Sequence, residues 1–268
     1  MKAHVISLLK SPRRAVATRR AAETGLDIEF FDAVDASSSE MVRTLSEASA
    51  PAFQRRYRRS QTAGEMACLL SHQALYRHLS LNPSTYQLIL EDDFIPLKEA
   101  GTLERILLAA PRENADVVIL GYAKTDDEME QAINITNPLM AKRQIADSTQ
   151  MIGLRCHETT CGALSYLVSP RFLQIMATNG DHGRLADDWD YHKQLGLKVM
   201  HVQPLCFRED FTGMASSLEP ARAAYSRKKL RLPEFLRPIW RHMLGVARRL
   251  QYCGEKTFKT RRIPKDEI

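Results

Sequence analysis

The first 35 residues alternate between apolar runs and a helical signal, and this alternation constrains the fold more than any other feature. Residues 4–9 (HVISLL) form a short apolar run. Ser11-Pro12 then starts a predicted helix that ends at Gly25, because Ser suits an N-cap, Pro the first helical position and Gly a helix C-terminus. A second apolar run follows at residues 28–31. A strand, a helix and a strand in this order predict a parallel α/β sheet with a right-handed crossover.

The rest of the chain continues this α/β pattern. Residues 117–121 (VVILG) are apolar on both faces, which predicts a central strand. Two stretches are polar. Residues 36–60 are expected to form a loop with some helix, and residues 123–150 an irregular excursion on the surface. The remaining expected strands are residues 86–90, 164–168 and 198–202, and the remaining expected helices are residues 64–79, 169–180 and 187–195.

Length and composition narrow the class of protein. A chain of 268 residues with 44% hydrophobic residues can bury one large core, which excludes a disordered, collagenous or disulfide-stapled protein. No run approaches the roughly 18–20 apolar residues of a membrane span. The five apolar residues before Lys10 lack a small-residue cleavage site, so no secretory signal is expected.

Five scattered cysteines, an odd number, favour reduced thiols in the cytoplasm. Cys156, His157 and Cys161 could be half of a zinc site or small buried hydrophobic residues, and the sequence offers no second pair.

The net charge of +6 is unevenly distributed. Residues 222–268 carry 14 Lys and Arg against 4 Asp and Glu, a net charge of +10. Residues 1–221 therefore carry 24 against 28, a net charge of −4. The basic segment could bind nucleic acid, anionic lipid or an acidic protein.

Two acidic clusters are candidates for chemistry. Glu91-Asp92-Asp93 directly follows a predicted strand, at the edge of an α/β sheet where ligands bind. Adjacent carboxylates repel one another unless a cation such as Mg²⁺ or Mn²⁺ lies between them, although a solvated turn is the simpler interpretation. Asp187-Asp188-Trp189-Asp190 could be an acidic helix N-terminus or could supply a general base.

The predicted helix at residues 64–79 carries polar side chains among apolar ones. Glu65 and His72 lie seven residues apart and therefore share one helix face. Either the pair faces a ligand, or His72 has a structural role in the core.

Six short blocks occur in an order typical of one enzyme family, between residue 4 and about residue 205. Together they resemble glycosyltransferase family 25, which contains lipooligosaccharide β-galactosyltransferases of Gram-negative bacteria and related collagen galactosyltransferases. The blocks are His4–Leu8 with the arginines that follow, Phe31–Asp35, Gly64–His72, Leu90–Asp93, Cys161-Gly162 through Ser169, and Asp187-Asp188-Trp189 before Gly196–Val199.

The resemblance implies a GT-A-type, Rossmann-like fold over residues 1–215 and inverting transfer from a UDP-sugar. It implies that Asp93 and Asp92 hold Mn²⁺ (or Mg²⁺), whose charge offsets that of the departing UDP. Asp188 would be the general base, with Asp187 as the alternative because the local motif departs from the family pattern. Ser7, Leu8, Arg13 and Arg14 would line the nucleotide pocket, and Glu65 and His72 would line the sugar side. Asp32, Glu91, Gly162 and the metal ligand Asp92 are the other expected substrate- or nucleotide-binding residues.

The segment of residues 216–268 is expected to be a basic amphipathic helical tail. Apolar residues from Phe235 to Leu250 recur near helical spacing, and several arginines lie off that stripe. Such a helix suits an anionic membrane surface, contacted through residues 222–262, or could dock on the catalytic body with a solvated basic face. No nucleic-acid partner is expected, because no recognition fold accompanies the aromatic residues.

The combined prediction is a cytoplasmic enzyme, peripheral on the inner face of the inner membrane, that transfers a hexose to a lipid-linked oligosaccharide acceptor. Galactose from UDP-galactose is the expected donor group, and a lipooligosaccharide or LPS the expected acceptor. The alternatives are a metal-dependent nucleotide-sugar hydrolase and a non-catalytic membrane-associated scaffold.

Overall fold

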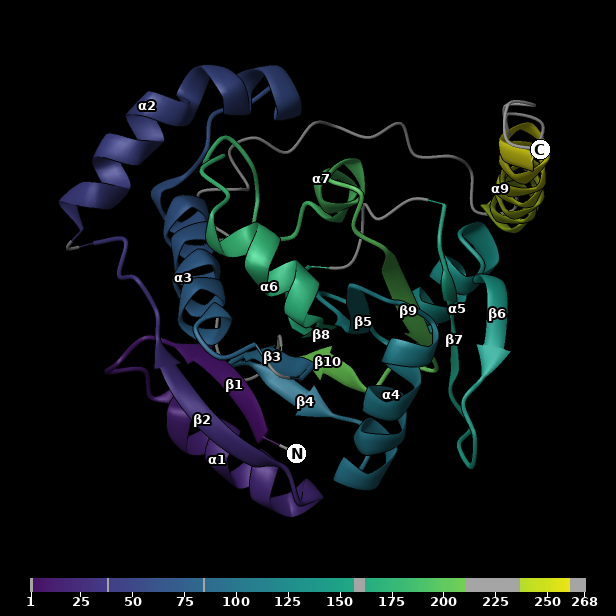
Figure 1. Cartoon of the computed structure of the whole chain (residues 1–268), viewed down its shortest axis with the longest axis horizontal. Coiled ribbons are helices and arrows are strands. Elements are labelled where there is room, and N and C mark those ends of the chain that lie inside the picture. Colours follow the sequence, from purple (N-terminus) through teal and green to yellow (C-terminus); the bar gives the residue numbers. More distant parts are fainter. Residues whose placement is uncertain (1, 38, 84, 157–161, 211–236, 261–268) are drawn as a thin grey trace, which may run out of the picture.

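The computed structural model describes residues 2–37, 39–83, 85–156, 162–210 and 237–260, with side chains of the last helix described for residues 238–253. Within these residues, one sheet of ten strands carries helices on both faces (Figure 1).

The sheet is mixed, and most of its central strands run in the same direction. Strands β1, β2 and β3 are mutually parallel, as are β5, β9 and the short β10, whereas β8 is inserted antiparallel between β3 and β5. The predicted parallel pairing of the first two strands is confirmed. The order along the sheet is β2 (Asp27–Asp32), β1 (Lys2–Ser7), β3 (Gln87–Glu91), β8 (Ser165–Val168), β5 (Val117–Tyr122), β9 (Val199–Gln203), β7 (Met151–Leu154) and β6 (Met140–Gln144), with β10 (Phe207–Glu209) pairing with β5 and β4 (Phe94–Pro96).

The core lies on both sides of the sheet because successive strand residues point to opposite faces. Val118 and Leu120 of β5 pack with α1 (Arg13–Thr24) and α4 (Ala100–Arg112). Val117 and Ile119 pack on the other face with α3 (Ala63–Ser80), α6 (Pro170–Ala177) and α7 (Trp189–Gln194). The prediction that this strand is central is therefore confirmed, and all six residues of β5 are buried.

Helix α3 is the longest element beside the cavity described below, and local sequence explains its start. Thr62 and Glu65 form a capping box, in which each side chain accepts a hydrogen bond from the other residue's backbone N–H, at 3.2 and 3.1 Å. Ten of its residues are buried, including Glu65 and His72. The helix therefore brings polar side chains into the interior at fixed positions.

Two polar stretches contain more regular structure than the loop with some helix and the irregular excursion that were expected. Residues 36–60 contain the 18-residue helix α2 (Glu40–Tyr57), which Ser39 caps by accepting from the Val42 N–H. Residues 123–150 contain α5 (Asp127–Thr136) and the edge strand β6. Polar composition misled the prediction because four of the five β6 residues are exposed, so an alternating apolar pattern is absent.

Helix α9 (Arg237–Thr260) lies beside α5 (Figure 1). Gly245 packs against the Ile135 carbonyl, where a Cβ would approach to 2.2 Å, and the Arg248 guanidinium donates to the Thr136 carbonyl at 2.6 Å. None of the helices in the described ranges has both the length and the apolar composition needed to cross a membrane. Residues 216–236 and 261–268 of the expected tail lie outside the described residues.

The described cysteines Cys68, Cys156, Cys206 and Cys253 are not disulfide-bonded. The Cys156 thiol donates to the Arg248 carbonyl at 3.3 Å, which links it to α9. Its suggested partners His157 and Cys161 lie outside the described residues, so the half-site stays untested.

Candidate functional site

A cavity of about 620 Å³ opens beyond the carboxyl ends of β1, β3 and β5. The chain passes from β1 to β2 on one side and later returns to β3 on the other, so the strand order reverses at β1. Loops diverge at such a switch point and leave room for a ligand. The wall is built from the turn after β1, the face of α3, the turn after β3, the end of β5, and residues 185–187 before α7.

Asp92 and Asp93 form the wall next to β1. The hydroxyls of Ser7 and Ser11 donate to Asp92 Oδ2 at 2.6 and 3.0 Å. Arg13 Nη1 lies 3.3 Å from Asp92 Oδ1 and 3.0 Å from Asp93 Oδ2. Contacts to Asp92 and Asp93 therefore connect the turn after β1 to the turn after β3.

Asp93 is in an environment that favours a bound cation. Burial, together with the nearby Glu91, Glu209 and Asp92 carboxylates, raises its pKa to about 7, and the Arg13 charge only partly opposes this. Asp93 Oδ1 is buried and accepts no hydrogen bond from the described residues. A buried carboxylate oxygen of this kind fits a divalent cation, so the residues present are compatible with the expected Mn²⁺ or Mg²⁺.

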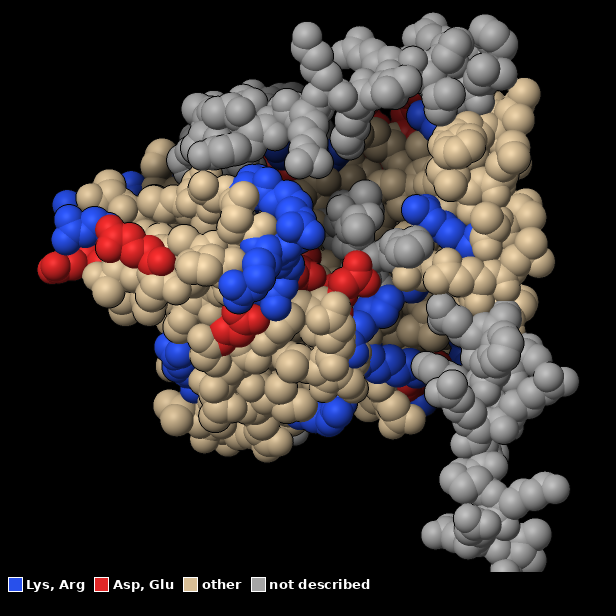
Figure 2. Space-filling view, turned by 90° about the horizontal axis from the view of Figure 1, so that it is seen from above, with Lys and Arg blue, Asp and Glu red and all other residues tan. Residues whose placement is uncertain are grey.

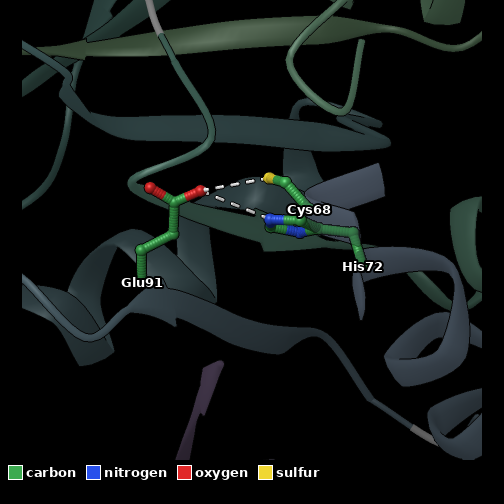
Figure 3. A group of neighbouring side chains, drawn as sticks. All are labelled: Cys68, His72 and Glu91. Carbon is green, nitrogen blue, oxygen red and sulfur yellow. Dashed lines mark hydrogen bonds and ion pairs between the residues drawn. The ribbon is translucent and has the colours of Figure 1, made fainter. Parts of the chain in front are cut away.

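Glu91, at the end of β3, points away from that pair toward α3. Its Oε1 atom lies 3.4 Å from His72 Nε2 and 3.9 Å from Cys68 Sγ (Figure 3). The other ring nitrogen of His72 lies 2.6 Å from the Tyr166 hydroxyl, which contacts the Tyr76 hydroxyl at 2.7 Å. His72 therefore connects a buried pair of tyrosines to the cavity.

Glu65 lines the cavity but is satisfied by structural partners. Its side chain is fully buried, and Arg59 forks onto both carboxylate oxygens at 2.7 and 2.8 Å. This ion pair is strong because the Glu65 carboxylate is buried and accepts two parallel hydrogen bonds from the Arg59 guanidinium. Glu65 and His72 both line the cavity, as their shared helix face predicts, but they bind different partners.

The two candidate bases, Asp187 and Asp188, are placed differently in the structure. Asp187 lines the cavity, whereas Asp188 does not. Asp188 caps α7 by accepting from the Tyr191 N–H at 3.0 Å, and its other oxygen accepts from the Tyr57 hydroxyl. Burial and this contact with the Asp188 carboxylate raise the pKa of Tyr57, which keeps the phenol protonated as a donor.

Of the other predicted residues, Leu8 and Gly162 line the cavity, but Arg14 and Asp32 do not. Arg14 pairs with Asp32 and donates to the Ser7 and Leu8 carbonyls at 2.9 and 3.1 Å, so it braces the turn after β1. Gly162 has a φ of +64°, and a Cβ there would lie 2.4 Å from the Ala123 Cβ. Only glycine fits this position without displacing the end of β5.

The prediction missed several residues of the cavity wall. Lys124 follows the carboxyl end of β5 and Glu209 is the last residue of β10, and the Lys124 N–H donates to the Glu209 carboxylate at 2.7 Å. The rule that ligands bind beyond strand ends could have identified Lys124. Ser11 and Cys68 also line the cavity. On the face of the molecule shown in Figure 2, acidic and basic side chains lie close together.

The mixed sheet and its acidic cavity are compatible with a Rossmann-like glycosyltransferase fold. Sequence comparison then identifies the family. A family model described as "Glycosyltransferase family 25 (LPS biosynthesis protein)" matches residues 1–188, and the chain belongs to this family. The match includes every predicted site residue and ends at Asp188.

A curated relative is similar over part of the chain. It is a "Glycosyltransferase 25 family member" of Drosophila melanogaster, 28% identical over 142 residues. The aligned segment covers 51% of this chain and 23% of the relative, so the chain matches about a quarter of that protein's length. The predicted family is confirmed, and family membership supports a transferase.

Proposed function

We propose that the chain is a metal-dependent, GT-A-type inverting glycosyltransferase that transfers galactose from UDP-galactose to a lipid-linked oligosaccharide such as a lipooligosaccharide. The single observation that carries this proposal is the cavity, which places Asp92 and Asp93 and the base candidate Asp187 around one space beyond the strand ends.

Asp92 and Asp93 would hold the divalent cation. Such a cation supplies positive charge against the diphosphate when UDP departs. Arg13 already lies within 3.3 Å of both carboxylates and orients them. Ser7 and Ser11 fix Asp92 from the side of β1, so the pair is held in place before any ligand binds.

Asp187 would accept the proton of the acceptor hydroxyl. As that O–H bond breaks, the oxygen forms a bond to the anomeric carbon of the donor, and the bond from this carbon to the diphosphate oxygen breaks. One displacement inverts the configuration and needs no covalent intermediate. Asp187 suits this role better than Asp188 because both Asp188 carboxylate oxygens already accept hydrogen bonds, one from the Tyr191 N–H of α7 and one from the Tyr57 hydroxyl.

Donor screening tests the proposal. The full-length protein is assayed with Mn²⁺, one lipooligosaccharide acceptor, and UDP-galactose, UDP-glucose or N-acetylated donors. We expect acceptor-dependent transfer that is fastest with UDP-galactose, and its loss in Asp93→Asn. Metal-dependent turnover that persists in Asp93→Asn would refute the metal assignment.

The two alternatives give different results. Free galactose released at the same rate with and without acceptor would favour a nucleotide-sugar hydrolase. Absence of UDP binding by calorimetry in the presence of Mn²⁺ would favour a non-catalytic scaffold.

We also propose that α9 binds the anionic surface of the inner membrane from the cytoplasmic side. Ile239, Met243, Val246 and Leu250 recur at helical spacing and are 53–68% exposed, while Gly245 and Arg248 face α5. The helix is therefore docked on the body and still presents an apolar stripe to solvent. Such a stripe with neighbouring arginines suits a lipid interface.

Vesicle sedimentation tests this placement. A variant with Ile239→Ser and Met243→Ser should lose most binding to phosphatidylglycerol-containing vesicles. Leu108→Ser is the matched control, because Leu108 on α4 is also 65% exposed but lies on another surface. Equal loss in both variants, or no loss in the α9 variant, would contradict the proposal.

A further inference from the structure

We propose that Cys68, His72 and Glu91 bind a thiophilic divalent cation of the zinc class in the cavity wall, separately from the oxygen-rich pair Asp92 and Asp93. This inference does not depend on the proposed transfer reaction. It rests on the geometry, burial and ligand chemistry of the three side chains.

The backbone places the three ligands together without rearrangement. Cys68 and His72 are four residues apart on α3, so their side chains lie one above the other on one helix face. Glu91 at the end of β3 completes the group, and the three ligand atoms all lie within 4.8 Å of one another (Figure 3).

Two of the three separations are close to those around a tetrahedral ion, and the third lies within 4.8 Å. Zinc–ligand bonds of about 2.0–2.3 Å at tetrahedral angles place ligand atoms roughly 3.3–3.8 Å apart. The Glu91 oxygen lies 3.4 Å from His72 Nε2 and 3.9 Å from Cys68 Sγ. Small side-chain rotations would therefore accommodate the ion.

The donor set selects zinc over manganese or magnesium. A thiolate and an imidazole prefer zinc, whereas carboxylates and water suit Mn²⁺ and Mg²⁺. The acidic run is thus divided between two kinds of site: Asp92 and Asp93 contact Ser7, Ser11 and Arg13, while Glu91 contacts sulfur and nitrogen.

A buried partner orients the imidazole for this role. His72 is 1% exposed, and the Tyr166 hydroxyl lies 2.6 Å from its Nδ1. Metal-binding histidines characteristically use their second nitrogen in such a contact, which fixes the ring and leaves Nε2 for the ion. Here Nε2 is the nitrogen that faces Glu91.

The arrangement leaves a fourth position open. All three ligands line the 620 Å³ cavity, so an ion bound by them would face the space that we assign to substrate. Three protein ligands and one open position are typical of a zinc site that binds an exchangeable oxygen ligand.

The competing explanation is a chain of hydrogen bonds from Tyr76 through Tyr166 and His72 to Glu91, with a neutral Cys68 thiol and no ion. The same distances are compatible with it. Cobalt spectroscopy separates the two, because only a bound thiolate produces sulfur-to-cobalt charge-transfer absorption in the near ultraviolet.

The full-length protein is stripped with chelator and titrated with Co²⁺. We expect a saturable charge-transfer band that Zn²⁺ removes and Mg²⁺ does not. Cys68→Ser should abolish the band, and Cys253→Ser, which changes an exposed cysteine on α9, should retain it. Tyr166→Phe should weaken Zn²⁺ binding by roughly 10- to 100-fold, the usual effect of removing an outer partner.

Absence of the band in the wild-type protein at saturating Co²⁺ would overturn the proposal, and this result needs no variant to fold. Retention of the band in folded Cys68→Ser would also overturn it. Asp93→Asn should keep the band while losing Mn²⁺ binding, so failure of this inference is distinguishable from failure of the proposed transferase.

Discussion

Two acidic clusters look alike in the sequence but are used differently by the fold. In Glu91-Asp92-Asp93, all three residues line the cavity. In Asp187-Asp188-Trp189-Asp190, only Asp187 does so, because Asp188 caps α7 and Asp190 lies 3.8 Å from Lys193 on the same helix.

The difference follows from what comes before and after each cluster. The first cluster ends a buried strand and begins a tight turn, so its side chains are directed beyond the sheet edge. The second begins a helix, whose first N–H groups compete for the carboxylates. A cluster at a strand end therefore supplies several groups to one cavity, whereas a cluster at a helix start is partly used by the backbone.

The largest expected effect concerns Asp187. Asp187→Asn should reduce kcat for transfer by about 10²- to 10⁴-fold, because the amide cannot accept the acceptor's proton. The KM for UDP-galactose should change little, since we propose that Asp92 and Asp93, and not Asp187, hold the metal that binds the donor. Steady-state kinetics at saturating acceptor measure both values.

Asp188→Asn is the matched comparison, and we expect its kcat to remain within a few-fold of wild type. If Asp188→Asn instead caused the large loss and Asp187→Asn were nearly normal, the roles would be exchanged. Capping geometry would then be a poor guide to which acid reacts.

A second test uses the raised pKa of Asp93, about 7 compared with 3.8 for an ordinary aspartate. Between these values the folded protein retains a proton that the unfolded chain releases, so the free energy of unfolding falls as pH rises from about 4 to 7. Across that interval, Asp93 should reduce the stability of the metal-free protein by roughly 2–4 kcal/mol.

The comparison is made with Asp93→Asn, which lacks this titration. In chelator, the melting temperature of the wild type relative to the variant should decrease from pH 4.5 to pH 8. Saturating Mn²⁺ should reverse the difference at pH 8, because the ion binds the folded wild type. Parallel curves for the two proteins would show that Asp93 has an ordinary pKa.

Local sequence signals predicted much of the fold. The strand, helix, strand opening is recognisable because Pro12 and Gly25 mark the limits of α1, and Gly25 has the expected left-handed φ of 71°. The turn of Glu91–Asp93 is recognisable because it follows the apolar strand β3. Elements with few buried residues, such as α5 and β6, gave no comparable pattern.

The partners within the site could not be predicted, because they depend on tertiary contacts. Arg59 meets Glu65 across six residues, but Tyr57 meets Asp188 across 131 residues. Nothing in the sequence near Asp188 indicates that a distant phenol occupies its carboxylate. Sequence reasoning therefore located both clusters but could not separate the acid that lines the cavity from the acid that holds α7.

The smallest expected effect tests the structural role of Asp188. Asp188→Ala removes the acceptor for the Tyr191 N–H and for the Tyr57 hydroxyl, which should lower the free energy of unfolding by about 1–2 kcal/mol. Asp190→Ala is the control, because its contact with Lys193 is a half-exposed pair and should contribute less than about 0.5 kcal/mol. Urea unfolding of both variants measures the difference. Equal losses would mean that the second cluster acts as one charged helix start, and the distinction between its acids would then rest on the kinetics of Asp187 alone.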